Sequence, residues 1–159
     1  MKKIIIILLL IEILFLFGCG KETNSKMIRS SLTLSAQSEV TLAIKDISSS
    51  SAVVTIYNGS TNKISYGAVY KFVLEKEIDG IWYVCERAEK TEEGHNIAAT
   101  DEEHFLESGM ADESEIFWDF LYGDLPTGKY RFIKEIWISP NHPSFTGDYI
   151  AAEFEIGAK

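Results

Sequence analysis

The sequence of 159 residues has little of what small enzymes and metal sites use: it holds two cysteines, three prolines and three histidines. Two cysteines allow at most one bridge, so a disulfide framework cannot hold the fold. His95, His104 and His142 lack the close spacing that places two imidazoles on one face of a helix or strand around zinc. We therefore predict neither a metal site nor a cofactor.

Nucleophile patterns are also missing. No serine stands in a Gly-x-Ser-x-Gly elbow, and the single-module length leaves little room for a cleft with paired carboxylates. Cys85 lies in an apolar, strand-like run, where a lone thiol is most often a buried small hydrophobe rather than a nucleophile. We expect no catalytic residue and interpret the chain as a protein that is not an enzyme.

The charge balance is acidic, with a formal net charge of −9. Nucleic acid and anionic lipid surfaces are both negative, so neither is an expected partner of the folded part. Many of the carboxylates lie between residues 101 and 115, but without the Asp-x-Asp-x-Asp-Gly ladder of a calcium loop. We interpret this segment as a solvated acidic loop, with a calcium site between strand ends as the alternative.

The one long apolar run lies at the N-terminus. Residues 4–17 are apolar apart from Glu12, and the run is shorter than the roughly 20 residues of a membrane-spanning helix. It ends in Leu16-Phe17-Gly18-Cys19, which resembles a bacterial lipobox. The resemblance implies cleavage after Gly18, a diacylglycerol with palmitate-like acyl chains on Cys19, and stable attachment to a membrane. A plain secretory peptide or an uncleaved N-terminal anchor is the alternative.

These features divide the chain into three predicted parts: a lipoprotein signal peptide at 1–18, a lipidated cysteine with a polar tether at 19–38, and a folded domain at 39–159. Loss of the signal peptide leaves 13 basic and 23 acidic side chains, a formal charge of −10 on the mature chain. A flexible tether of this length spans roughly 25 Å. As an alternative, the part around Leu32 docks on the domain as a first edge strand.

From residue 39 onward, apolar and polar residues alternate with the period of two that is typical of β-strands. The longest alternation, at 66–78, would place Tyr70, Phe72 and Leu74 on one face, and it ends at Asp79-Gly80, the signal of a tight hairpin. Residues 87–111 have no clear period, so we expect long loops there with one short strand at 96–99. The predicted strands are 40–45, 53–57, 66–78, 81–86, 115–120, 129–138 and 149–156.

The segment that runs from Leu125 through Pro126 and Gly128 to Tyr130 has the pattern of a tyrosine corner, in which the Tyr hydroxyl bonds back to upstream backbone. Together with segments 64–67, 74–84 and 118–136, it resembles the bacterial Ig-like domain of Gram-positive lipoproteins and secreted proteins over roughly residues 39–157. The resemblance implies an all-β, immunoglobulin-like antiparallel β-sandwich of about seven strands that lies outside the cytoplasm. It brings no catalytic residues.

We therefore expect a monomeric, extracytoplasmic module that is lipid-anchored to the bacterial cell membrane through Cys19 and binds a protein or a cell-wall polymer. End loops often carry binding function, and the candidate partner-contact loop contains Trp137, Pro140, His142 and Pro143. One alternative is a protease inhibitor that acts through residues 139–144 of this loop. Another is an accessory lipoprotein that stabilises a membrane complex.

Overall fold

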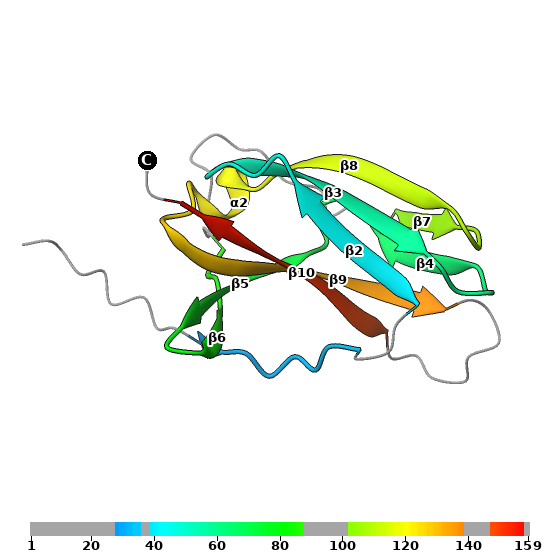
Figure 1. Ribbon diagram of the computed structural model, residues 1–159, viewed down its shortest axis with the longest axis horizontal. Helices are drawn as coiled ribbons and strands as arrows, with labels where there is room; N and C mark the ends of the chain where they lie inside the picture. The colour runs from blue at the N-terminus through cyan, green and yellow to red at the C-terminus, as the bar shows by residue number, and fades with distance from the viewer. Residues whose placement is uncertain (1–27, 36–38, 88–101, 139–146, 158–159) are drawn as a thin grey trace, which may run out of the picture.

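The computed structural model describes residues 28–35, 39–87, 102–138 and 147–157, and these residues form an all-β fold. Two antiparallel sheets face each other as a sandwich, as predicted (Figure 1). The elements are β1 (Ile28–Arg29), β2 (Val40–Lys45), β3 (Ser51–Asn58), β4 (Ile64–Gly67), β5 (Val73–Ile78), β6 (Ile81–Val84), β7 (Glu103–Leu106), β8 (Ala111–Phe117), α2 (Asp119–Tyr122), β9 (Gly128–Ile138) and β10 (Asp148–Ile156).

The small sheet has the order β2-β3-β8. Its central strand, β3, alternates buried Ala52, Val54 and Ile56 with less buried neighbours, which is the pattern of a strand with one face on the core. β2 pairs along one edge of β3 and β8 along the other. The alternation therefore predicts β2 and β3 well, whereas the strand predicted at 115–120 is wrong in its bounds, because β8 ends at Phe117 and the helix α2 follows it.

The large sheet is built around β9, and it divides into two halves along one edge of that strand, an arrangement that we call the fork. β10 pairs with one edge of β9 from Gly128 to Ile136. The other edge is shared, because β5 pairs with residues 130–133 and β4 with residues 136–138. β6 and β1 extend the β5 half, whereas β7 extends the β4 half. Figure 1 shows the β5–β6 hairpin lying apart from β4 and β7, which approach β8 of the small sheet.

The single strand predicted at 66–78 is wrong, because the run forms two strands. Tyr66 is opposite Ile136 and Val73 is opposite Ile133, so six residues of the run lie across from two residues of β9. Because of this surplus of four residues, the chain loops out as a bulge over 68–72, which is closed by a hydrogen bond of 2.9 Å from the Lys71 amide to the Ala68 carbonyl. Tyr70, predicted for the core face, is instead 37% exposed.

Part of the segment expected to be long loops is also strand. β7 pairs with β4, and β8 begins at Ala111 rather than at 115. The inward positions at the ends of these two strands, Leu106 and Ile116, are buried. Polar residues at the other inward positions, His104, Asp112 and Ser114, obscure the alternation in the sequence. The short strand predicted at 96–99 lies outside the described residues.

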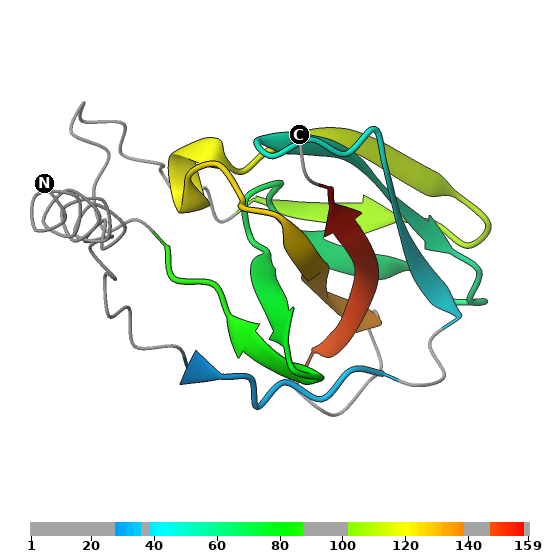
Figure 2. The same ribbon diagram turned by 60° about the vertical axis from the view of Figure 1, so that its left-hand side comes forward.

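Residues 28–35, which we call the strap, lie against the large sheet. β1 pairs with the outer edge of β6, so Ile28 is opposite Val84. The amide of Ser30 donates to the Trp82 carbonyl and the amide of Ser35 to the Tyr149 carbonyl, each at 2.9 Å. Of the two possibilities for this stretch, a free tether or a docked edge strand, the docked strand is the one found at 28–29. Both views show the strap running from β6 toward the start of β10 (Figures 1 and 2).

The core lies between the sheets as two apolar clusters. The first surrounds the fully buried Trp118 and includes Tyr130, Phe132 and Phe154. The second surrounds Ile64 and contains Val40, Ile56, Tyr66, Leu106, Ile136 and Ile150. Within the described ranges, no helix has the length and apolar character needed to cross a bilayer.

Candidate functional site

A lysine interrupts the apolar interior at the fork of the large sheet. The inward-facing positions of β9 are Tyr130, Phe132, Lys134 and Ile136, and Lys134 is only 4% exposed. The sequence analysis did not single out Lys134. The signal was present, because a charged residue stood at an inward position of a strand that was otherwise predicted correctly.

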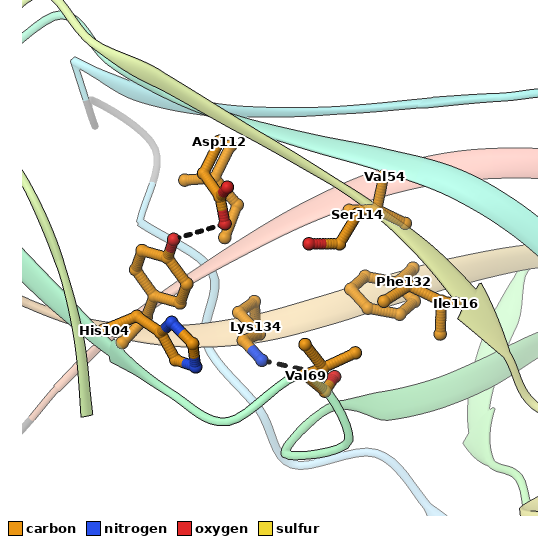
Figure 3. A pocket seen from close by; sticks show the side chains of 10 residues that line it. Val54, Val69, His104, Asp112, Ser114, Ile116, Phe132 and Lys134 are labelled. Carbon is orange, nitrogen blue, oxygen red and sulfur yellow. Dashed lines mark hydrogen bonds between the residues drawn. The ribbon is translucent and has the colours of Figure 1, made fainter. Parts of the chain in front are cut away.

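The Lys134 ammonium binds the bulge that divides β4 from β5. Its Nζ donates to the Ala68 carbonyl at 2.6 Å and to the Val69 carbonyl at 3.5 Å (Figure 3). It also lies 5.8 Å from the centroid of the Tyr66 ring. The looped-out residues cannot pair their backbone groups with β9. The Lys134 ammonium supplies the missing hydrogen-bond donor to two of their carbonyls.

Facing Lys134, two side chains join the sheets. The Tyr66 hydroxyl, from β4 of the large sheet, donates to Asp112 Oδ2, from β8 of the small sheet, at 2.6 Å. His104 of β7 stacks on Tyr66, with ring centroids 5.6 Å apart and an interplanar angle of 11°. Ser114 of β8 adds a hydroxyl to the same wall.

We call Tyr66, His104, Asp112, Ser114 and Lys134 the polar pocket. They surround a cavity of about 30 Å³ together with apolar side chains of both sheets (Figure 3). A cavity of that size holds about two or three water molecules, since a water needs about 10–15 Å³ of such space. The polar pocket therefore suits a hydrated hydrogen-bond network better than an organic substrate.

Burial controls the ionisation of the polar pocket. Burial, with a smaller contribution from nearby Lys71 and an opposing one from Asp112, lowers the pKa of Lys134 to about 8. Burial, followed by the hydrogen bond to Asp112, raises the pKa of Tyr66. The Lys134 ammonium is thus held at a cost in solvation.

A second buried charge lies on the outer face of the large sheet. Arg131 Nε donates to Glu75 Oε2 at 2.5 Å, and the Trp82 ring covers the guanidinium at 4.5 Å. Glu75 Oε1 is buried without a hydrogen-bond partner among the described residues. Beside this pair, Lys129 bridges Glu77 and Glu153 at 2.8 Å each, but these side chains are more exposed.

The residues of the proposed tyrosine corner come together at the start of β9. The Tyr130 hydroxyl donates to the Pro126 carbonyl at 2.6 Å, and both Tyr130 and Leu125 are buried. Gly128 has a φ of +154°, and a Cβ there would approach the Lys76 side chain to 2.7 Å. Burial raises the pKa of Tyr130 to about 12. The hydroxyl therefore stays protonated as a donor.

Other predicted positions are only partly described. Trp137 is half-buried near the end of β9, opposite Ser65, whereas Pro140, His142, Pro143 and Cys19 lie outside the described residues. Burial raises the pKa of Cys85 to about 11, which disfavours the thiolate that a nucleophile needs. In the described part of the chain, no three His, Cys, Asp or Glu side chains are grouped so that they could hold a metal ion.

Comparison with known proteins identifies a family whose model matches this chain. A family model described as a bacterial Ig-like domain matches residues 32–155. This range covers most of the chain and begins inside the strap, seven residues before the start that the sequence predicted at residue 39. No curated protein matches the sequence.

Proposed function

The chain belongs to the bacterial Ig-like domain family, and we propose that it is a monomeric interaction module held outside the cell membrane by a lipid on Cys19. Domains of this family are typically non-catalytic and usually extracellular or exposed at the surface. The polar pocket is consistent with a non-catalytic role, because its cavity has room for water rather than for a substrate. The half-buried thiol of Cys85, whose pKa is raised to about 11, also argues against nucleophilic chemistry.

The observation that carries the anchor is the Leu-Phe-Gly-Cys sequence at 16–19 directly after the apolar run. Each buried methylene of an acyl chain contributes about 0.8 kcal/mol, and two or three chains hold a soluble domain stably on a bilayer. Cys19 is the one cysteine near the N-terminus, so it is the residue that would carry the lipid. The mature chain would begin at that residue.

The partner is a protein or a cell-wall polymer, met through the loop that follows Trp137 and contains Pro140, His142 and Pro143. Trp137 supports this assignment because it lies near the end of β9 on the outer face and is not fully buried. An aromatic side chain at such a position is a common anchor of an interface. Nothing among the described residues favours the protease-inhibitor alternative.

The anchor is tested by fractionation of cells that express the full chain, with radioactive palmitate in the medium. We expect a labelled protein in the membrane fraction, and an unlabelled Cys19→Ser variant that stays as a larger precursor because the lipid-dependent peptidase cannot cut it. Cys85→Ser is the matched control and should behave as the native chain does. Equal label and equal processing in the Cys19→Ser variant would contradict the proposal.

A further inference from the structure

The strap decides from which end of the sandwich the chain leaves toward its N-terminus. Ile28 is opposite Val84, Val84 is opposite Glu75, and Glu75 is opposite Arg131. Coming from the N-terminus, the chain therefore joins the fold beside Arg131, near the start of β9. We call this end, with the β5–β6 turn and the start of β9, the tethered end.

The domain strands begin at the opposite end. Val40, the first residue of β2, is opposite Asn58, and the Asn58 side-chain Nδ2 donates to the Leu106 carbonyl at 3.0 Å. Leu106 is in turn opposite Ile64, which is opposite Ile138, the last residue of β9. Since residues 131 and 138 are seven positions apart and a strand rises about 3.3 Å per residue, the two levels are about 23 Å apart. We call this the far end.

Docking of the strap therefore determines which end of the domain a membrane anchor would hold. With the strap docked, eight residues lie between Cys19 and Ile28, and the nine residue-to-residue steps reach at most about 30 Å. With the strap released, nineteen residues would lie between Cys19 and residue 39, and the chain would join the domain at its far end. Both views place the blue start of the strap, β1, and the β7–β8 turn on opposite sides of the molecule (Figures 1 and 2).

We infer that the strap is an orienting device: docked on β6 and β10, it holds the tethered end next to the membrane and turns the far end outward. This inference rests on the proposed lipid at Cys19. The short link makes it effective, because its nine residue-to-residue steps reach at most about 30 Å, whereas the twenty steps to residue 39 would reach about 66 Å.

The far end is where a partner outside the membrane would be met. It contains the turns 59–63 and 107–110 and the ends of β9 and β10 that flank residues 139–146. Phe105 and Met110, each more than half exposed, lie near these turns. A free tether at residue 39 would bring this surface toward the lipid headgroups, whereas the docked strap presents it to a protein or polymer beyond them.

The test measures energy transfer from a dye to acceptor lipids for the lipidated chain purified from bacterial membranes and placed in vesicles of phosphatidylglycerol and phosphatidylethanolamine. The dye is attached at Thr61→Cys for the far end or at Glu155→Cys for the tethered end, in a Cys85→Ala background. Glu155 is exposed and opposite Lys129, and Thr61 is exposed in the 59–63 turn. Transfer should be higher from position 155 than from position 61.

The strap is then released by Ser30→Pro with Ser35→Pro, which remove the two amide donors that bind Trp82 and Tyr149. We expect the order of transfer to reverse in this double variant and to stay native in the control Thr33→Pro, an exposed strap position. Higher transfer from position 61 with the native strap, or an order that the double variant leaves unchanged, would overturn the inference alone. A mass spectrum without lipid on Cys19 would overturn the proposed function as well.

Discussion

Lys134 donates a hydrogen bond of 2.6 Å to the Ala68 carbonyl at the point where the large sheet forks. A lysine is an expensive residue for such a place, because burial lowers its pKa from 10.5 to about 8. Its retention there fits a role in fixing the bulge at 68–72, which lets the β4–β7 half approach the small sheet while β5 and β6 diverge.

The stability of the native chain should rise with pH between 8 and about 10.5 relative to a Lys134→Met variant. In this window the unfolded lysine still binds its proton while the folded one has lost it, so the unfolded state binds more protons and unfolding becomes less favourable as pH rises. A shift of this size corresponds to about 3 kcal/mol. Urea unfolding of both proteins at several pH values gives the difference, from which other titrating groups cancel. Parallel pH profiles would contradict the assignment.

Tyr66 and Asp112 should be energetically coupled across the two sheets. Removing the hydroxyl in Tyr66→Phe takes away the 2.6 Å hydrogen bond to a carboxylate, and we expect a loss of about 1.5–3 kcal/mol. A double-mutant cycle with Asp112→Asn isolates the pair. The double variant should lose clearly less stability than the sum of the losses in the two single variants. Additive effects would show that the two side chains do not depend on each other.

Tyr130→Phe should destabilise the domain by about 1 kcal/mol, the typical worth of one hydrogen bond, here the 2.6 Å bond to the Pro126 carbonyl. The ring itself stays, so no cavity is created. Tyr57→Phe is the matched control, since Tyr57 is 44% exposed on β3 and should change the unfolding free energy little. Equal effects at the two positions would argue against the corner.

The Arg131–Glu75 pair should be the costliest charge interaction to break. Glu75→Ala leaves the guanidinium of Arg131 buried without its partner, and such losses are about 3–5 kcal/mol. Lys129→Met removes the more exposed bridges to Glu77 and Glu153 and should cost clearly less, because solvent screens exposed ion pairs. Thermal unfolding of both variants separates the two cases, and similar losses would mean that burial of the Arg131–Glu75 pair matters little.

Most of the sandwich could be predicted from alternation, but the fork could not. The bulge adds four residues across from β9, and an even number leaves the in-and-out phase unchanged, so that Tyr66 and Leu74 both still face inward. The alternation therefore continues through a break in the strand. An insertion of odd length would have reversed the faces and revealed itself.

The strap was difficult to foresee for a different reason. Its polar composition is typical of a tether, and its attachment depends on the backbone amides of Ser30 and Ser35, which most other residues would supply equally well. Lys134, in contrast, was visible as a charge at an inward position of a predicted strand. A buried charge in a core-facing row is the signal that would have found the polar pocket.

The lipid anchor is tested most directly by the mass of the N-terminal peptide of the protein extracted from bacterial membranes. We expect a peptide that begins at Cys19 and carries a diacylglycerol on its sulfur. A peptide that begins elsewhere, or a Cys19 with a free thiol, would contradict the lipid anchor and with it the membrane-held orientation of the domain.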